Sequence, residues 1–347
     1  MRYTTIGSVR EGQILGKNIY SMDGKILLRN GVSLTKQIIL KLKQLGITAI
    51  YIKDDRFSDI EVEDIVSEET KRATIGVLSE SVKCIQTGKE LNMKELQNNT
   101  SELIDEILKN KDNLVFLGDI LTKDNQLFIH SVNVCIISII IGINLKMSRN
   151  QLQELALGAL FHDIGKVIPD EALDKLTLKH DNVNEHTWRG FYYLRKKPEI
   201  NAVSSIVALE HHEYMNGKGS PRGLKKDEIH LYAKIVGLAN YYDNLVNPHM
   251  GNIRIKPHEA LEKIMGLTNH FFEHDIVWQF LQSIATYPNG STVRLSTNEI
   301  GIVVGQHKGL PTRPIIRLLK EQNSNQIEAM EIDLAKEKTV FIEEVLE

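Results

Sequence analysis

The sequence predicts a mainly α-helical protein: a helical bundle, with a small β/α module at its amino-terminal end and a small β extension at its carboxyl-terminal end. Apolar residues recur at helical intervals through residues 114–287. Short apolar runs separated by Gly, Asn and Pro mark the two ends. At 347 residues the chain is long enough for two or three domains, each with its own core.

Residues 1–57 form the predicted amino-terminal module. Its apolar runs are separated by Asp23-Gly24 and Asn30-Gly31, pairs that favour tight β-turns. An amphipathic run over residues 34–45 predicts a helix, and the run Ala49-Ile50-Tyr51-Ile52 predicts the closing strand. No residue here indicates a signal. We therefore interpret the module as a small packing domain and keep a regulatory or oligomerising role as the alternative.

Residues 58–113 are rich in Glu, Lys, Gln, Asn and Ser, with apolar residues such as Leu78, Val82 and Ile85 at helical intervals. This pattern predicts a helical linker whose polar faces meet solvent. A solvated linker is our main interpretation. A signal relay, or a homodimer formed through these helices, stays open.

The most apolar stretch of the chain, residues 134–145, lies early in the predicted bundle. It is shorter than the ~20 residues that a membrane span needs. Ser138, Gly142 and Asn144 also interrupt it. We therefore interpret it as a buried core helix and expect no membrane span.

The pattern changes after Pro288-Asn289-Gly290. Apolar residues over 292–295 and 300–304 predict strands, with prolines further on as breaks. Residues 288–347 are therefore expected to form a β-rich extension.

Composition excludes several classes of protein. With 42 basic and 45 acidic side chains the formal net charge is -3, which gives no support to duplex nucleic-acid binding or membrane coating. Cys84 and Cys135 are too few for a disulfide framework and favour a reducing compartment. The first residues, Met1 to Thr5, lack the apolar core of a signal peptide. We therefore expect a cytoplasmic protein.

Two imidazole-rich clusters in the helical block are the most informative feature. His162-Asp163 is followed by Gly165-Lys166, and the chain later carries His211-His212-Glu213. Imidazoles and a carboxylate suit iron, manganese or zinc, and a helical bundle can project them into one interior. Lys166 adds a positive charge for an anionic oxygen, which indicates metal-assisted hydrolysis of a phosphate ester. The candidate ligands are six residues: His130, His162, Asp163, His186, His211 and His212.

These residues belong to an ordered set of motifs. The set consists of His130, His162-Asp163-Ile164-Gly165-Lys166, His186 with Gly190, His211-His212-Glu213, and the loop from Asn216 through Gly219-Ser220-Pro221 to Leu224. Over residues 114–287 it resembles the HD-GYP family of cyclic di-GMP phosphodiesterases, in the HD metal-dependent phosphohydrolase superfamily, as a divergent member. The resemblance implies a helical bundle with two divalent metal ions, iron or manganese, with zinc as the alternative. It also implies hydrolysis of cyclic di-GMP to pGpG or GMP in bacterial second-messenger signalling.

The resemblance further implies roles for individual residues. Asp163 would bridge the two ions, and Lys166 would face the phosphoryl oxygens during catalysis. The metal positions would be His130, His162, Asp163, His186, His211, His212 and Asn240. The substrate-binding positions would be Lys166, Ser220, Arg222, His249 and Asn252.

Several of these positions depart from the family pattern. Asn240 stands where the family has a metal-binding Asp, and an amide oxygen is a weaker ligand than a carboxylate. Ser220 replaces the tyrosine of the signature loop, so an aromatic surface for the substrate is missing. His249 and Asn252 stand at positions where the family has basic residues that grip phosphate.

Two more positions set expectations for the metals. Gln126 replaces the glutamate of three-metal members, so we expect no third ion. Asp243 matches a second acidic position that is not normally assigned to metal.

Three functional interpretations follow. The first is a working two-metal phosphodiesterase acting on cyclic di-GMP. The second is a catalytically degenerate domain that binds a nucleotide or a protein partner without turnover. The third keeps the metals but acts on another phosphoester, such as a related cyclic dinucleotide. We favour the enzyme, because a domain abandoned as a catalyst has little chemical reason to keep all six metal-type residues.

Overall fold

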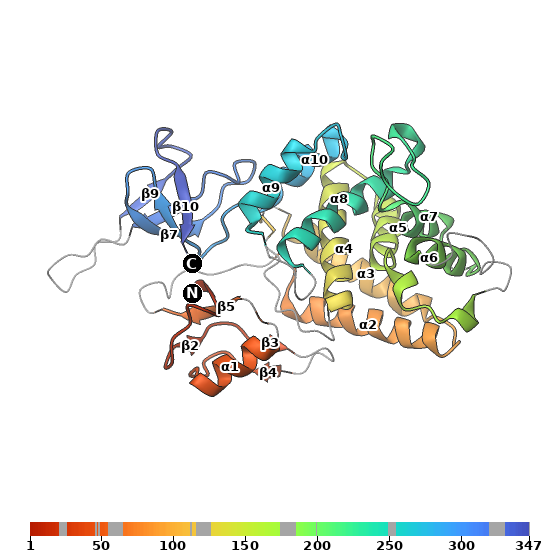
Figure 1. Ribbon diagram of the computed structural model, residues 1–347, viewed down its shortest axis with the longest axis horizontal. Helices are drawn as coiled ribbons and strands as arrows, with labels where there is room; N and C mark the ends of the chain where they lie inside the picture. The colour runs from red at the N-terminus through yellow and green to blue at the C-terminus, as the bar shows by residue number, and fades with distance from the viewer. Residues whose placement is uncertain are drawn as a thin grey trace. The chain divides into compact units, whose positions relative to one another are not determined.

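The computed structural model describes residues 1–20, 26–45, 47, 49–54, 65–111, 113–115, 126–173, 185–198, 200–248, 255–318 and 330–346. The chain divides into two compact units. The first takes Met1–Asp64, Asp112–Asn125 and Gln282–Glu347, and the second takes Ile65–Lys111 and Gln126–Leu281. Among the described residues every named strand lies in the first unit and every α-helix except α1 lies in the second (Figure 1). The predicted mainly α fold with β modules at both ends is confirmed.

The amino-terminal part of the first unit is a small antiparallel sheet with one helix. The strand order is β1-β5-β2, and a separate hairpin pairs β3 with β4. The bounds are β1 Arg2–Thr5, β2 Ile14–Leu15, β3 Ile19–Tyr20, β4 Ile26–Leu28, α1 Lys36–Gln44 and β5 Ala49–Lys53. Helix α1 adds Ile39 and Leu42 to a core that also holds Leu15 and Ile50. The predicted helix and closing strand are confirmed, and Asp23-Gly24 lies outside the described residues.

The carboxyl-terminal part of the same unit is a five-stranded antiparallel sheet in the order β10-β6-β7-β8-β9. Its strands are β6 Thr292–Leu295, β7 Ile300–Gly305, β8 Ile315–Leu318, β9 Glu331–Asp333 and β10 Ile342–Leu346. Alternate side chains, among them Val293, Val303 and Ile316, are buried in a separate core. The strands predicted from the sequence are confirmed.

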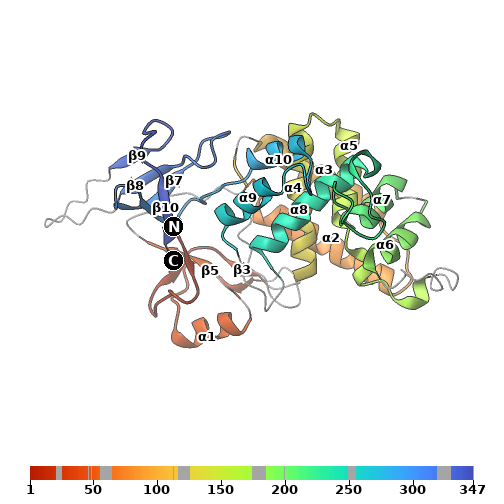
Figure 2. The ribbon, with the colours of Figure 1, turned by 45° about the horizontal axis from the view of Figure 1, so that its top comes forward.

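Helix α4 lies at the centre of the second unit, packed against α2, α3, α5, α8 and α10 (Figures 1 and 2). The α-helices of the unit are α2 Glu68–Gln86, α3 Met93–Lys109, α4 Gln126–Asn144, α5 Arg149–Leu160, α6 His186–Arg195, α7 Ala202–Glu210, α8 Leu231–Val246, α9 Pro257–Gly266 and α10 His274–Leu281. By length and composition α4 could cross a membrane, but 83% of its most apolar window is buried inside the structure. The helix is longer than the apolar stretch that the sequence shows, because it already starts at Gln126. Burial identifies it as the core helix that the sequence predicts.

Helices α2 and α3, which the sequence indicated as a linker, group with the helices of the second unit. Leu103 and Ile107 of α3 are fully buried, as is Ile85 of α2. Arg149, the first residue of α5, donates hydrogen bonds to the Asp105 carboxylate on α3. Their inner faces bury polar side chains as well, among them Thr74 of α2 and Thr100 of α3.

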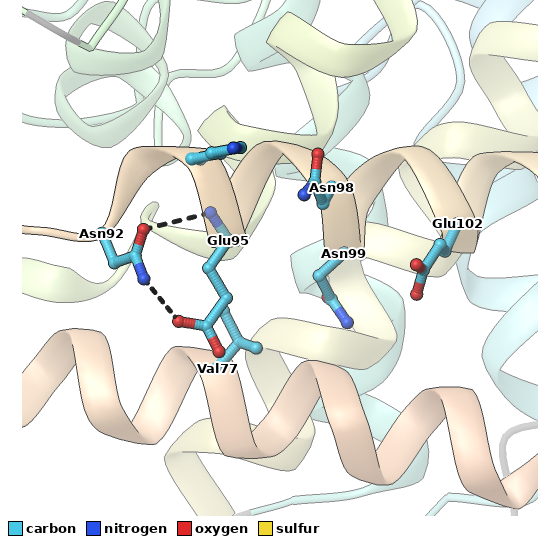
Figure 3. A pocket seen from close by; sticks show the side chains of 7 residues that line it. Val77, Asn92, Glu95, Asn98, Asn99 and Glu102 are labelled. Carbon is cyan, nitrogen blue, oxygen red and sulfur yellow. Dashed lines mark hydrogen bonds between the residues drawn. The ribbon is translucent and has the colours of Figure 1, made fainter.

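The amino-terminal end of α3 is capped by a reciprocal pair (Figure 3). The Asn92 side-chain oxygen accepts from the Glu95 amide at 3.3 Å, and the Asn92 side-chain nitrogen donates to the Glu95 carboxylate at 2.8 Å. Next to this cap is a polar hollow of about 370 Å³ between α2 and α3, lined by Val77, Asn92, Lys94, Glu95, Asn98, Asn99 and Glu102. It shares no residue with the two imidazole-rich clusters.

Replacing Leu103 by alanine should destabilise the helical unit by about 2–5 kcal/mol, because the change leaves a cavity where α3 packs. Leu108→Ala makes the same chemical change at a residue of α3 that is 37% exposed, and should cost far less. Urea unfolding followed by helical circular dichroism measures both. Equal, small effects of the two changes would mean that α3 is a loosely attached linker after all.

Candidate metal centre

Metal-type side chains from separate segments of the second unit converge on one buried site. Helix α4 provides one histidine, the segment after α5 provides a His-Asp pair, α6 begins with a histidine, and α7 is followed by a His-His pair. The donor atoms form two groups, in each of which they lie within 4.8 Å of one another: Asp163 with His186, His211 and His212, and Asp163 with His130 and His162. Asp163 belongs to both groups. The structure therefore brings together all six candidate ligands.

Two glycines allow the donor-bearing segments to approach one another. A Cβ atom added to Gly165 would lie 1.8 Å from the carbonyl oxygen of His186. A Cβ atom added to Gly237 of α8 would lie 2.8 Å from the carbonyl oxygen of His211. Any larger residue would push these backbones apart, so the convergence depends on glycine at both positions.

Hydrogen bonds to backbone carbonyl oxygens fix the orientation of two of the imidazole rings. Nδ1 of His162 lies 2.7 Å from the Ala159 carbonyl oxygen, and Nδ1 of His211 lies 3.0 Å from that of Ala208. Because a carbonyl oxygen only accepts, Nδ1 carries the proton in both rings. Each Nε2 is left with a lone pair directed into the site, the arrangement usual for a metal-binding histidine.

Two buried polar atoms of the site have no hydrogen-bond partner among the described residues: His162 Nε2 and Asp163 Oδ1. Asp163 Oδ1 lies 3.2 Å from His186 Nε2 and 3.6 Å from His211 Nε2, without hydrogen-bond geometry to either. Unpaired polar atoms are costly to bury and rare in proteins. A divalent cation would satisfy both atoms, so these residues fit iron, manganese or zinc.

The protonation of the site also suits a cation. Burial lowers the pKa of His212 to about 2, and it lowers the pKa of His162 and of His211 below the ordinary value. Burial alone would raise the pKa of Asp163, but the imidazoles around it outweigh that effect and hold its pKa well below the usual range. At neutral pH His162, His211 and His212 are therefore neutral and Asp163 is ionised, the forms that bind metal.

Lys166 lies at the edge of this site. Its Nζ donates to Asp163 Oδ2 at 2.5 Å, while 37% of its side chain is exposed. The turn that carries it is held by Arg189 of α6, which donates to the carbonyl oxygens of Gly165 and Ile168. A positive charge therefore borders both the candidate ligands and the solvent.

Asn240 and Asp243, one turn apart on α8, both contact His130. Asn240 Oδ1 lies 3.0 Å from His130 Nε2, and Asp243 Oδ2 lies 2.7 Å from His130 Nδ1. Asp243 is 1% exposed and also accepts bonds from the side chains of Asn133 and Asn247. Burial lowers the pKa of His130, but its hydrogen bond to Asp243 and the charge of that carboxylate outweigh burial and raise the pKa.

Asp243 thus orients His130, a role that the sequence analysis missed. Its spacing of three residues from Asn240 was the available signal, because residues three apart lie on one face of a helix.

Two glutamates that were not predicted as site residues hold the signature loop, residues 216–224, in place. Glu213 accepts from the backbone amide of Arg222, and Glu210 accepts from the Arg222 guanidinium at 3.0 Å. The Ser220 amide donates to the His212 carbonyl oxygen at 3.1 Å. The loop is therefore tied to a candidate ligand through Ser220, while the guanidinium of Arg222 is engaged by Glu210.

His249 and Asn252 lie outside the described residues. Gln126, where three-metal members carry glutamate, donates from its side-chain amide to the Pro248 carbonyl oxygen at 3.1 Å.

Comparison with known proteins agrees with this geometry. Residues 116–274 match the family model described as HD domain, and residues 292–347 match the one described as KOW domain associated with HD domain. The cyclic di-GMP phosphodiesterase PA4108 of Pseudomonas aeruginosa is 30% identical over 216 residues, which cover 60% of this chain and 52% of the relative. A cyclic di-GMP phosphodiesterase of Thermotoga maritima is 31% identical over 166 residues, covering 46% of this chain and 45% of the relative.

A third relative carries a different substrate in its name. The 3'3'-cGAMP-specific phosphodiesterase 1 of Vibrio cholerae is 28% identical over 137 residues, covering 38% of this chain and 29% of the relative. The chain thus spans about half the length of the first two relatives and less of the third. From the order of the motifs, their convergence and these matches, residues 116–274 form an HD domain of the HD-GYP family, followed by the KOW domain associated with such domains.

Proposed function

We propose that this chain is a metal-dependent phosphodiesterase that hydrolyses cyclic di-GMP to pGpG or GMP in bacterial signalling. The observation that carries the proposal is Asp163, which belongs to both donor groups and buries Oδ1 without a hydrogen-bond partner in the part of the chain that the structure describes. A carboxylate shared between two ions is suited to the hydrolysis of phosphate esters. The names of the Pseudomonas and Thermotoga relatives support cyclic di-GMP as the substrate.

Two divalent ions would be held here. Asp163 would bind both, one with His186, His211 and His212, and the other with His130, His162 and Asn240. Such ions supply the charge that polarises a phosphoryl oxygen and the acidity that makes a nucleophile of water at neutral pH. Iron or manganese is the metal we propose, with zinc as the alternative, since histidine and aspartate accept all three.

The other residues of the site would handle the substrate. As water adds to phosphorus and the bond from phosphorus to a ribose oxygen breaks, the Lys166 ammonium would counter the negative charge on the phosphoryl oxygens. Ser220 lies next to His212 and would border the nucleotide. We assign substrate contacts also to Arg222, His249 and Asn252, although Arg222 would first have to exchange its bond with Glu210.

The cyclic dinucleotide 3'3'-cGAMP is a second candidate substrate. The Vibrio relative's name supports it, and Ser220 offers no aromatic face that would select one base over another. A binding domain without turnover is the remaining alternative, motivated by the neutral ligand Asn240. The convergence of all six other ligands favours the enzyme.

We place this activity in the cytoplasm. Cys84 and Cys135 are free thiols, and the apolar helix α4 is mostly buried. A homodimer through α2 and α3 stays a prediction, which a mass measurement in solution would test.

The experiment that tests the proposal incubates protein purified without oxygen with manganese or ferrous iron and either cyclic di-GMP or 3'3'-cGAMP. Chromatography of the products gives the answer. Formation of pGpG or GMP from cyclic di-GMP supports the proposal, and cleavage of 3'3'-cGAMP alone supports the second substrate. Intact dinucleotides, with folded and metal-loaded protein, would favour the binding domain.

His162→Ala and Asp163→Ala should each abolish hydrolysis and reduce the bound metal, because both remove donor atoms from the centre of the site. The matched control is His274→Ala, which changes a histidine that is exposed on α10. Metal analysis and the hydrolysis assay are run on the same samples. Full hydrolysis by both site variants would rule out this centre as the catalyst.

Asn240→Asp should raise manganese affinity and the metal bound per chain, because a carboxylate is a charged ligand and an amide is neutral. Equilibrium dialysis at a fixed free manganese concentration measures the change. Asn98→Asp, the same substitution at an exposed position of α3, should leave metal content as it is. A site that gains nothing from Asn240→Asp would mean that residue 240 does not face the metal.

Asp243→Asn should weaken manganese binding by roughly 10–100-fold, the usual cost of losing the group that orients a metal-binding histidine. Calorimetric titration with manganese measures this loss. Asp275→Asn, an exposed carboxylate on α10, is the control. Unchanged affinity in Asp243→Asn would show that His130 needs no orienting carboxylate.

A further inference from the structure

Asn244 contacts the weakest of the candidate metal ligands. Its Nδ2 donates to Asn240 Oδ1 at 2.7 Å from one turn further along α8. The same Oδ1 lies 3.0 Å from His130 Nε2. Asn240 is 4% exposed and Asn244 is half-buried. A single amide oxygen therefore faces both the donor group of Asn244 and the candidate metal site.

The position of that oxygen fits a metal ligand. Two donor atoms at right angles on one ion, each ~2.1 Å from it, are roughly 3.0 Å apart. Asn240 Oδ1 and His130 Nε2 have this separation. His130 Nε2 is also 3.8 Å from Asp163 Oδ2, the shared carboxylate. The amide oxygen thus lies where the family's carboxylate would bind.

An amide, unlike a carboxylate, can face a metal with the wrong atom. If the Asn240 side chain turns over, its NH₂ group takes the place of Oδ1, and a group that only donates cannot bind a cation. A carboxylate has two oxygens and no such orientation to lose. Asn244 presents its own donor group to this spot, which stabilises the arrangement with the Asn240 oxygen toward His130.

We propose that Asn244 is a positioning residue that turns the Asn240 oxygen toward the metal subsite of His130 and His162. The inference rests on the proposed metal-dependent function. Through this pair of amides the chain keeps a usable, neutral ligand where the family has an aspartate.

Asn244→Ala in the full chain tests the proposal, because it removes the donor and alanine is well tolerated within a helix. Manganese bound per chain is measured by equilibrium dialysis over a range of free manganese, with no substrate present. Manganese at the His130 subsite should bind about 10-fold or more weakly, within the 10–100-fold range typical of groups behind a ligand. Manganese at the subsite of His186, His211 and His212 should bind as before. The control Asn98→Ala should change the manganese affinity of neither subsite.

The decisive comparison repeats the change in the Asn240→Asp background. There the orientation of residue 240 no longer matters, so N240D/N244A should bind manganese as N240D does. Wild-type binding by N244A would overturn the proposal. An equal loss in both backgrounds would also overturn it, because Asn244 would then support the fold rather than the amide. If circular dichroism shows that the alanine variant is unfolded, Asn244→Leu, which keeps the volume, is expected to give the same pattern.

The proposed function and the positioning role fail separately. If the variants behave as expected but no dinucleotide is cleaved, the proposed activity is wrong and the role of Asn244 holds. If dinucleotides are cleaved and N244A binds manganese normally, the proposed activity holds and the positioning role of Asn244 is wrong.

Discussion

The buried carboxylate of Asp163 is the constraint on which the helical unit depends. A charged group that is 2% exposed is costly inside a protein unless its neighbours compensate it. Here the ammonium of Lys166 donates to Oδ2, while Oδ1, which has no hydrogen-bond partner among the described residues, is left for a cation. The ends of α5, α6 and α7 therefore have to lie where they do, because a shift of one residue would rotate a donor away from the carboxylate.

Close backbone packing keeps this arrangement rigid, and so do the hydrogen-bond acceptors that lie behind the imidazole rings. Gly165 and Gly237 bring two pairs of backbones into direct contact, and Ala159 fixes the ring of His162 through its carbonyl oxygen. Asp243 does the same for His130 from a different helix. Donor atoms held in this way need little rearrangement when a cation binds, which is what a catalytic site requires.

Local patterns in the sequence predicted most of the candidate metal ligands and most of the helices. They could not predict which distant segments contact one another. The doublets around His162 and His211 lie within a few residues of helix ends, so their convergence in a bundle followed from pattern and order. The spacing of Asp243 from Asn240 places both on one face of α8, but the bond from Asp243 to His130 also depends on the register of α8 against α4, which no local pattern reveals. The inward packing of α2 and α3 was missed for a similar reason, since residues such as Leu103 look alike in a solvated and in a packed amphipathic helix.

The candidate ligands come from α4, the ends of α5 and α7, the start of α6, and α8, segments that are far apart in an unfolded chain. Any ion that binds this set prefers the folded unit, so its binding free energy adds to the stability of the whole bundle. Proteases act on opened chains, and their access falls as that stability rises. The supply of metal in the cell would therefore control the lifetime and abundance of this protein as well as the loading of its site.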